Sequence, residues 1–471
     1  MKGLHLKYII YTFCIFIIIG MLCVYLPNPY LWYDEAGQFF ISQGLNHYSA
    51  PFSPEGGLYD VIVNSRGYNM DPGGFSVILY FWQKISTSYL WLRLLPALFF
   101  FGFAFTLYKV SIYETKNKIL SIVIATLPFI LPIFTNRITE LRAYSMEMMG
   151  VMLSVWLIMR FKDNLNIKRL LVLSVVQVLF MSSRYGYIMV ASGVSIYLVY
   201  FLYKQNKLYI FASKAMIYGL PLIITVLVVY FGMMSFQNGH AGQMSYAGYL
   251  SSSLLMFMSP MSILYYAVII LAVLKVLKKN KFSDLHILAL IIGTIYFILS
   301  AIGHYPWEMH RTISAYSLFV FTLIIDMAKW ANARSCAKME ILAFSVLALC
   351  LLLWGVLYKM VHNNVTEQQI AEYGVFVGKY TFKKMRVEAP LNPILRYQYE
   401  YSTLKDVYKK HGYPEKFHLV DGGSHSFNAK NQYDILTAES DCDIVWNWED
   451  EYPSFCEPIA GHPHFYKHVN K

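Results

Sequence analysis

Apolar stretches of about 20 residues recur along this chain, and they constrain its fold more than any other feature. A helix of that length crosses a hydrocarbon core roughly 30 Å thick. Only 14% of the residues are charged and 57% are apolar, whereas about a quarter of the residues in a soluble domain are charged. The sequence therefore predicts a polytopic α-helical membrane protein and excludes a soluble enzyme, a disordered chain and a disulfide scaffold.

Eleven of these stretches are predicted to span the membrane as helices. Another apolar segment, residues 74–82, is too short to span and is expected to lie along the interface or inside the protein. The predicted spans are residues 8–27, 92–109, 119–135, 145–160, 168–182, 186–203, 215–235, 261–277, 285–302, 312–329 and 340–360.

The distribution of Lys and Arg predicts the orientation of these helices, because basic residues concentrate in cytoplasmic loops. One set of alternating loops holds 19 of them, and the opposite set of short loops holds 7. The N-terminus is therefore expected to be cytoplasmic, and eleven spans would place the C-terminal tail outside. This bias explains most of the net charge of +11, so no nucleic-acid partner is expected.

The chain is expected to form two domains. Residues 1–361 would form the transmembrane domain, with a first outer loop at 28–91, and the polar tail 362–471 would form a small extracytoplasmic domain. Short β-prone runs (FHLV, YDIL and CDIVW) predict an α/β or β-rich fold for this tail. Cys442 and Cys456 lie 14 residues apart in it, and an oxidising outer compartment would allow them to form a disulfide.

Ionisable residues are nearly absent from the predicted spans and gather at their outer ends. Since a proton or ion pathway normally carries carboxylates through the membrane, this pattern disfavours a pump. Asp34 and Glu35 follow the first span directly, in the sequence WYDEA. They either cap a helix beside an aromatic belt or hold a carboxylate at the membrane boundary, where it could accept a proton from a hydroxyl group.

A second group of charges lies between the third and fourth predicted spans, in the sequence RITELRAYSME at 137–147. In a helical register Glu140, Tyr144 and Glu147 share one face, and Arg142 points away from it. Arg142 either extends to the interface from the membrane or binds phosphate, because the guanidinium group is a planar fork that suits phosphate oxygens.

Two further outer arginines allow the same two interpretations. Arg184 lies in the sequence SSRYG, and Arg311 follows Glu308 in the sequence HYPWEMHR at 304–311. The two histidines of that sequence are six residues apart across a proline, which fits no standard zinc motif. The sequence therefore assigns no metal ligands.

Taken in order, these motifs resemble those of the C-type (GT-C) membrane glycosyltransferases, and in particular the bacterial relatives of protein O-mannosyltransferases and aminoarabinose transferases. The first outer loop of that family opens with an aromatic-Asp-Glu motif, which WYDEA at 32–36 matches. The sequence Asp71-Pro72-Gly73-Gly74 stands where the family has a His-Pro-Pro-like element, with Asp71 in place of His.

Two later motifs extend the resemblance, which covers roughly the first 330 residues. Glu140, Arg142 and Tyr144 match a Glu-x-Arg-x-Tyr motif that follows the second helix in the family. Arg311 corresponds to an arginine near the start of a late helix, and Thr312 follows it where the family commonly has Tyr. The resemblance therefore implies the GT-C fold for the transmembrane part of the chain.

The resemblance also implies an activity: inverting transfer of a sugar from a polyprenyl-phosphate donor to a hydroxyl or amine acceptor. The reaction would take place at the outer face of the cytoplasmic (inner) membrane. The resemblance leaves metal dependence open, because only some branches of the superfamily need a divalent metal such as Mg or Mn, and it implies no other cofactor. The implied roles are catalysis by Asp34, with Glu35 as the alternative base; donor-phosphate binding by Arg142, Arg184 and Arg311; and sugar or acceptor binding by Asp71, Glu140, Tyr144 and Glu308.

Neither the sugar nor the acceptor can be named from the sequence. A surface polysaccharide such as O-antigen is favoured as the acceptor, because the polar tail could extend towards a long glycan, and lipid A or a protein are alternatives. Two other functions stay open. An O-antigen polymerase or ligase also acts on lipid-linked glycans with outer arginines, and a lipid or glycan transporter would place charges or broken helices at the middle of the membrane.

Overall fold

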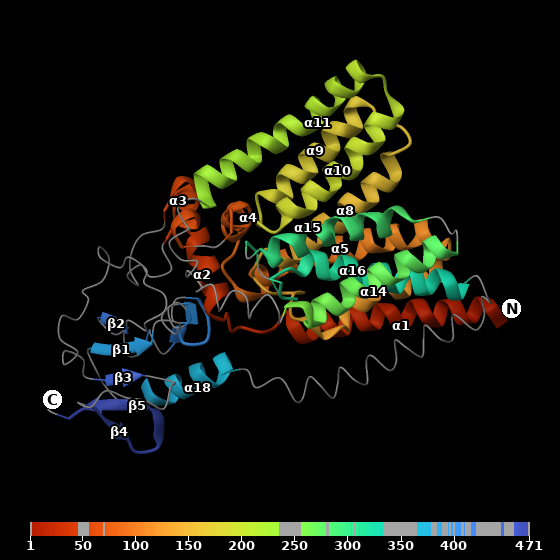
Figure 1. The fold of residues 1–471 in the computed structure, drawn as a ribbon. Helices are drawn as coiled ribbons and strands as arrows, with labels where there is room; N and C mark the ends of the chain where they lie inside the picture. The colour runs from red at the N-terminus through yellow and green to blue at the C-terminus, as the bar shows by residue number, and fades with distance from the viewer. Residues whose placement is uncertain are drawn as a thin grey trace. The chain divides into compact units, whose positions relative to one another are not determined.

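The computed structural model is a mostly helical protein with a small sheet near its C-terminus (Figure 1). This confirms the predicted helical architecture and, in the tail, the β-prone runs FHLV and part of CDIVW, whereas YDIL lies outside the described residues. The structure describes residues 2–45, 56–68, 71–234, 256–278, 282–302, 304–305, 307–309, 311–332, 365–377, 384–388, 394, 397–398, 401–406, 409, 416–420, 444–446 and 456–469.

Seven of the described helices are long and apolar enough to cross a membrane. Each coincides with one of the predicted spans, so the chain is a multi-pass membrane protein by helix length and hydropathy. The predicted span at 340–360 lies outside the described residues. The seven segments are Tyr8–Tyr25, Tyr89–Thr115, Tyr187–Gln205, Leu208–Met233, Pro260–Leu277, Asp284–Ala301 and Ile313–Trp330.

The prediction of one continuous span at 119–135 is wrong, and prolines are the reason. The helix α6 (Lys118–Thr126) ends before Pro128, which lies in a short 3-10 turn, and Pro132 opens the separate short helix α7 (Pro132–Thr135). Proline has no N–H to donate and its ring clashes with the preceding helical turn, so it favours the start of a helix over its interior. Single prolines are accommodated inside Tyr89–Thr115 and Leu208–Val229, whereas the two prolines four residues apart interrupt the helix here.

Two other predicted spans are helices outside the set of seven. The helix α8 (Tyr144–Phe161) carries Glu147 and Arg160, and α9 (Ile167–Met181) has only 15 residues. A helix of 15 residues is about 22 Å long at 1.5 Å per residue, which is shorter than the hydrocarbon core. Among the described residues, seven helices therefore meet the length and hydropathy of a span, and α8 and α9 do not.

Two compact units divide the chain. The first is the helical unit, which comprises Met1–Leu26, Asp71–Phe75 and Leu94–Tyr358, and the second comprises Pro27–Met70, Ser76–Arg93 and Lys359–Lys471. The helical unit holds most of α1 (Lys2–Tyr25) and α5 (Tyr89–Thr115), then α6 to α9, α10 (Tyr187–Gln205), α11 (Leu208–Val229) with the π-helix Tyr230–Met234, α14 (Pro260–Leu277), α15 (Asp284–Ala301) and α16 (Ile313–Asn332).

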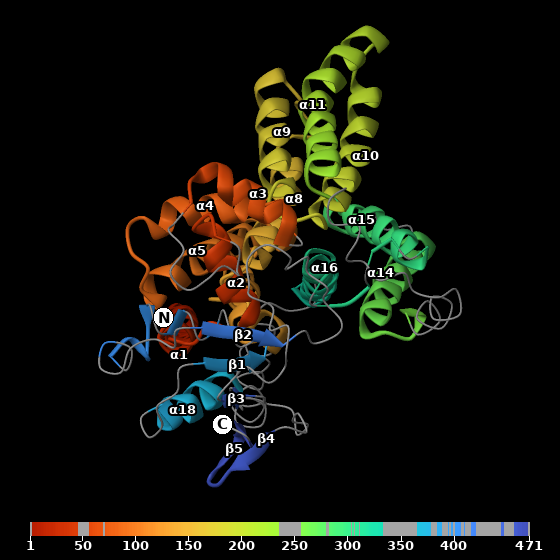
Figure 2. The ribbon, with the colours of Figure 1, turned by 90° about the vertical axis from the view of Figure 1, so that its left-hand side faces the viewer.

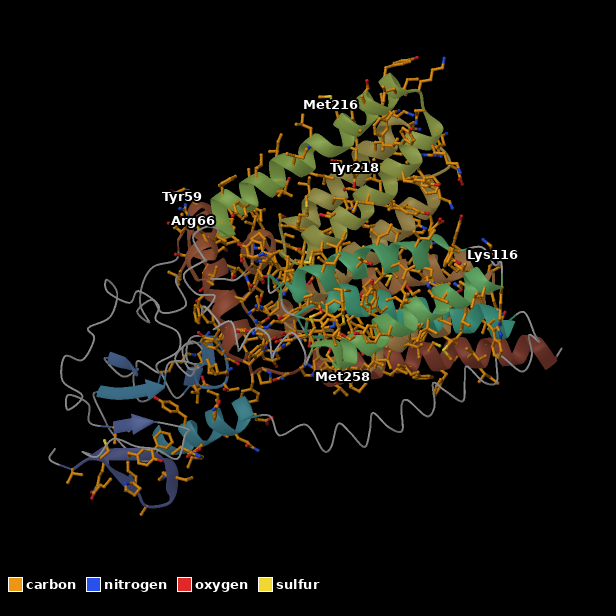
Figure 3. All side chains as sticks on the ribbon, in the orientation of Figure 1. Tyr59, Arg66, Lys116, Met216, Tyr218 and Met258 are labelled. Carbon is orange, nitrogen blue, oxygen red and sulfur yellow. The ribbon has the colours of Figure 1, made fainter. Side chains whose placement is uncertain are left out.

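Within the helical unit, α9, α10 and α11 lie side by side in both ribbon views (Figures 1 and 2). Met216 on α11 is 66% exposed, whereas Tyr218, two residues further on, is 2% exposed and hydrogen-bonds Ser195 and Ser174 of its neighbours (Figure 3). Hydrogen bonds between polar side chains join helices where apolar contact alone does not distinguish a neighbour from lipid. The exposed apolar face of α11 is therefore suited to lipid.

Ion pairs between partly buried side chains connect the helices at the end of α8 that lies after Phe161. Lys162 Nζ lies 2.7 Å from Asp284 Oδ2 at the start of α15, and Lys275 Nζ of α14 lies 2.7 Å from Asp326 Oδ2 of α16. The Asp326 carboxylate also lies 2.7 Å from Nδ1 of the fully buried His286. Each carboxylate neutralises a lysine that the sequence assigns to the cytoplasmic side.

The second unit contains α2 (Tyr33–Ser42), α3 (Leu58–Tyr68) and most of α4 (Gly74–Gln83), together with the C-terminal tail. The turn from α4 into α5 is held by two stacked tryptophans, Trp82 and Trp91, whose ring centres are 4.4 Å apart. Each indole N–H donates to the backbone oxygen of the other residue, at 2.8 and 2.9 Å. Segment 74–82, which was expected to be interfacial or internal, is therefore a short helix ending in a fixed turn.

The tail packs on the first loop inside this second unit. The ring of Phe39 in α2 lies 5.1 Å from the ring centres of both Tyr397 and Tyr401. Gln43 Nε2 donates to the Tyr401 hydroxyl at 3.0 Å, and Gln398 Nε2 donates to a backbone oxygen of the loop at 3.1 Å. The first loop and the C-terminal tail thus share one core. The predicted domain boundary at residue 361 stays a prediction.

A five-stranded mixed sheet forms the end of the tail, in the order β2-β1-β3-β5-β4. Strands β2, β1 and β3 are parallel neighbours, and β5 runs antiparallel to β3 and β4. Cys456 is buried in β4, and Cys442 lies outside the described residues, so their disulfide stays a prediction. The elements are α18 (Val365–Val377), β1 (Lys384–Glu388), β2 (Lys416–Val420), β3 (Ile444–Trp446), β4 (Cys456–Ile459) and β5 (His462–His468).

Candidate functional site

Three arginines come together around the buried ring of Tyr144, the first residue of α8. The guanidinium carbons of Arg137 and Arg184 each lie 4.2 Å from the ring centre, and that of Arg142 lies 5.9 Å from it. The negative face of an aromatic ring attracts cations within about 6 Å. Tyr144 therefore gives these three positive charges a common platform.

Two carboxylates pair closely with two of the arginines. Glu140 accepts a hydrogen bond from Arg137, three residues before it. Glu147 Oε2 lies 2.9 Å from Arg184 Nε, and its side chain is fully buried in α8. The distance between Glu147 and Arg184 is that of a close ion pair, although the two atoms do not meet the geometry of a hydrogen bond.

A third carboxylate, that of Asp71, lies between Arg142 and Arg184. Its Oδ1 is 3.7 Å from Arg184 Nη1, and its Oδ2 is 3.8 Å from Arg142 Nη2. Both distances are too long for a hydrogen bond. We call this set the arginine cluster: Tyr144, Arg137, Arg142, Arg184, Asp71, Glu140 and Glu147.

Glycines bring the Asp71 segment to this position. Gly73 has φ of +91°, a conformation that residues with a side chain rarely adopt. The N–H of Gly74 then donates to the Ser182 carbonyl oxygen at 2.7 Å, in the turn that leads to Arg184. A Cβ atom on Gly74 would lie 2.5 Å from that oxygen, so only glycine allows the two backbones to approach this closely.

The predicted helical register of residues 140–147 is wrong at its start. Helix α8 begins at Tyr144, and a tight turn in which the N–H of Arg142 donates to the Glu140 carbonyl oxygen at 2.7 Å precedes it. Glu140 therefore does not continue the helical face of Tyr144 and Glu147. The turn instead brings Arg142 near the ring of Tyr144, although the helical register placed it on another face.

Beneath Arg184, polar side chains close around Gly186. A Cβ atom on Gly186 would lie 2.4 Å from the Tyr305 hydroxyl and 2.9 Å from Glu147 Oε1. The hydroxyl of Tyr296 donates to the Gly186 carbonyl oxygen at 2.6 Å and lies 2.7 Å from Ser314 Oγ. The surroundings of Gly186, next to the arginine cluster, are therefore polar and closely packed, and they are formed by α8, α10, α15 and α16.

The electrostatics of this site keep Arg184 charged. Burial lowers the pKa of its guanidinium. The Asp71 and Glu147 carboxylates together raise this pKa by more than burial lowers it, so the net shift is upward. Burial is also the main cause that raises the pKa of the Tyr305 phenol, which therefore stays neutral and can act as a hydrogen-bond donor.

Arg311 and Glu308 have a different environment. They pair with each other at 3.3 Å, and their side chains are 57% and 50% exposed. Exposed pairs of this kind contribute little to stability. Of the three predicted phosphate ligands, the structure thus brings Arg142 and Arg184 together. The predicted sugar or acceptor ligands Asp71, Glu140 and Tyr144 lie in the same cluster. Arg311 and Glu308 form a separate exposed pair.

The acidic motif of the first loop lies in the second unit, at the first turn of α2. Glu35 is buried, pairs with Arg93 at 2.9 Å, and accepts from the N–H of Trp32 at 3.2 Å. Arg93 also donates to backbone oxygens of residues 28 and 30. Glu35 therefore holds the loop together, whereas the half-buried Asp34 is the more accessible of the two carboxylates.

Sequence reasoning gave three residues of the site no role. Glu147 lies inside the predicted span at 145–160, where a charge is costly, and that position is the signal that a buried partner exists. Arg137 and Tyr305 lay in the motifs already singled out, but only the fold shows that they meet Tyr144 and Arg184. Among the described residues, no three His, Cys, Asp or Glu side chains converge as metal ligands.

No model of a known protein family matches this chain, and no curated protein matches it at a significant level. The chemistry of the site therefore has to be argued from its own residues. Two arginines that face one carboxylate beside an aromatic ring can bind an anionic group, and phosphate has the charge and oxygen spacing that guanidinium groups recognise.

We expect Gly74→Ala to lower the apparent Tm of the detergent-solubilised protein, by an amount equivalent to about 1–3 kcal/mol, because the new methyl group meets a backbone oxygen that cannot move aside. Gly219→Ala is the matched control, since nothing lies within 4 Å of a Cβ atom at that helical position. Equal thermal stability of the two variants would show that the Asp71 segment is not docked at Ser182.

Proposed function

We propose that this protein is an inverting membrane glycosyltransferase that takes its sugar from a polyprenyl-phosphate donor at the outer face of the cytoplasmic membrane. The observation that carries the proposal is the convergence of Arg142 and Arg184 on one carboxylate beside Tyr144. The order of the motifs along the chain, which resembles that of GT-C glycosyltransferases, connects this anion site with a lipid-linked sugar.

In this proposal Arg142 and Arg184 bind the donor phosphate and stabilise the negative charge that develops on it as the sugar leaves. Tyr144 supports both guanidinium groups, and Glu147 fixes Arg184 from below. Arg311 is not given this role, because its side chain is exposed and paired with Glu308. Glu140 orients Arg137.

Asp34 is the proposed base. An acceptor hydroxyl or amine attacks the anomeric carbon while the bond from that carbon to the phosphate oxygen breaks, and the acceptor proton passes to the Asp34 carboxylate. The configuration at the anomeric carbon inverts, and the polyprenyl phosphate leaves. Glu35 is a weaker candidate because Arg93 and the Trp32 N–H already engage its oxygens.

A surface polysaccharide remains the favoured acceptor, with lipid A or a protein as alternatives. Metal dependence and the outer location of the tail stay proposals. An O-antigen polymerase or ligase and a lipid or glycan transporter are the competing functions. Sugar transfer from a radiolabelled polyprenyl-phosphate sugar in membrane vesicles, compared with glycan export in the same vesicles, separates these classes.

Arg142→Ala should reduce sugar transfer by about 100-fold or more, since removal of one preorganised ligand of a developing charge typically costs about 10²–10³ in rate. Arg142→Lys should recover only part of this loss, because lysine keeps the charge and loses the planar fork. Arg311→Ala serves as the control for removal of an outer arginine and should have a clearly smaller effect. Equal losses in Arg142→Ala and Arg311→Ala would contradict the assignment of the phosphate site.

Asp34→Asn should reduce turnover by about 10²–10⁴-fold, the usual contribution of a positioned general base, while donor binding and thermal stability stay close to wild type. Glu35→Gln should instead lower thermal stability, because it leaves the buried Arg93 with a weaker partner. Full turnover in Asp34→Asn, measured as transfer from the labelled donor, would remove Asp34 from the mechanism.

A further inference from the structure

We propose that Asp71 is an exchangeable counter-ion of Arg142 and Arg184, and that a phosphate ligand binds these two arginines by replacing the Asp71 carboxylate between them. This inference rests on the proposed phosphate site and gives Asp71 a role that differs from binding the sugar or acceptor.

The contacts of Asp71 are incomplete on both sides. Its carboxylate is buried, yet its oxygens stay 3.7 and 3.8 Å from the two guanidinium groups. Charge-assisted hydrogen bonds between such groups are about 1 Å shorter. Asp71 Oδ2 and Arg184 Nη1 also have no hydrogen-bond partner among the described residues. The position between the two guanidinium groups therefore favours an anion, and this carboxylate contacts them only at long distance.

A phosphate group fits the same position better. It is larger than a carboxylate and presents several oxygens in a tetrahedral arrangement, so separate oxygens can accept from each arginine. Guanidinium groups bind such oxygens with two parallel N–H donors. The ligand can thus complete contacts on Arg142 and Arg184 that Asp71 leaves long.

The charge balance of the arginine cluster requires an exchange rather than simple addition. Three arginines face three carboxylates, so the cluster has no net charge when all six groups are ionised. A phosphate that joined it with Asp71 in place would lie against a buried negative charge, which is unfavourable in a site of low dielectric constant. A phosphate group that replaces Asp71, with one negative charge as a diester and about 1.5 to 2 as a monoester at pH 7, leaves the cluster closer to neutrality than one added beside it.

Asp71 is the carboxylate of the cluster that can leave. Glu140 hydrogen-bonds Arg137, and Glu147 is fully buried within α8 at 2.9 Å from Arg184. Asp71 instead precedes the Pro72-Gly73 turn, whose far side is anchored by the Gly74 hydrogen bond to Ser182. Rotation about its two side-chain torsions moves the carboxylate away without disturbing that anchor.

The test is calorimetric titration of the full-length, detergent-solubilised protein with two probes, a short-chain prenyl monophosphate and inorganic phosphate. Asp71→Asn removes the competing charge and should lower the Kd for the prenyl phosphate by about tenfold. Asp163→Asn is the matched control: it makes the same change in net charge at an exposed position beyond the opposite end of α8, and its Kd should equal that of wild type. Tighter binding of prenyl phosphate than of inorganic phosphate would identify a lipid phosphate as the source.

A second variant keeps the proposal testable if Asp71→Asn is too unstable to purify. Asp71→Glu has a longer side chain that reaches both guanidinium groups more closely, so it should compete better and raise the Kd by about tenfold. If the wild type binds the probe and Asp71→Asn binds it equally or more weakly, the exchange is wrong and the phosphate site stands. If neither protein binds either probe, the phosphate site and the exchange both fall.

Discussion

The buried guanidinium of Arg184 is the constraint on which the rest of the site depends. A charge that is removed from water needs close partners of opposite sign, and Arg184 finds them in two carboxylates from different parts of the chain, Asp71 and Glu147. These two ion pairs connect the segment before α4, the start of α8 and the turn before α10. Gly74 and Gly186 are small because backbone and polar side chains must approach closely there.

The opposite end of α8 follows the same principle with a different outcome. There each carboxylate contacts its lysine at 2.7 Å, and the buried His286 completes one of the networks. These pairs use short contacts and join helix ends, as expected of structural neutralisation. The arginine cluster differs, because one of its carboxylates is held at long distance from both partners. This contrast between the two ends supports the proposal that the arginine cluster binds a ligand, whereas the lysine pairs stabilise the fold.

Hydrophobic length and composition predicted the membrane helices well, because an uninterrupted apolar stretch of about 20 residues has few alternatives to a spanning helix. The same reasoning failed at 119–135, where Pro128 and Pro132 interrupt an apolar run, and at Glu140, where a turn replaces the expected helix.

Residue types identified Arg142, Arg184 and Asp71 as candidates. Their convergence could not be predicted, since it depends on a glycine contact between segments more than 100 residues apart. The exposed pair of Arg311 and Glu308 shows the converse limit, because a motif match does not determine burial.

The most direct measurement is a cryo-electron microscopy structure of the full-length protein bound to a short-chain prenyl phosphate. The account predicts phosphate density between the Arg142 and Arg184 guanidinium groups, beside Tyr144, with the Asp71 side chain turned away from both arginines. Phosphate density at Arg311, or at Lys275 in the last turn of α14, with Asp71 still between Arg142 and Arg184, would contradict it.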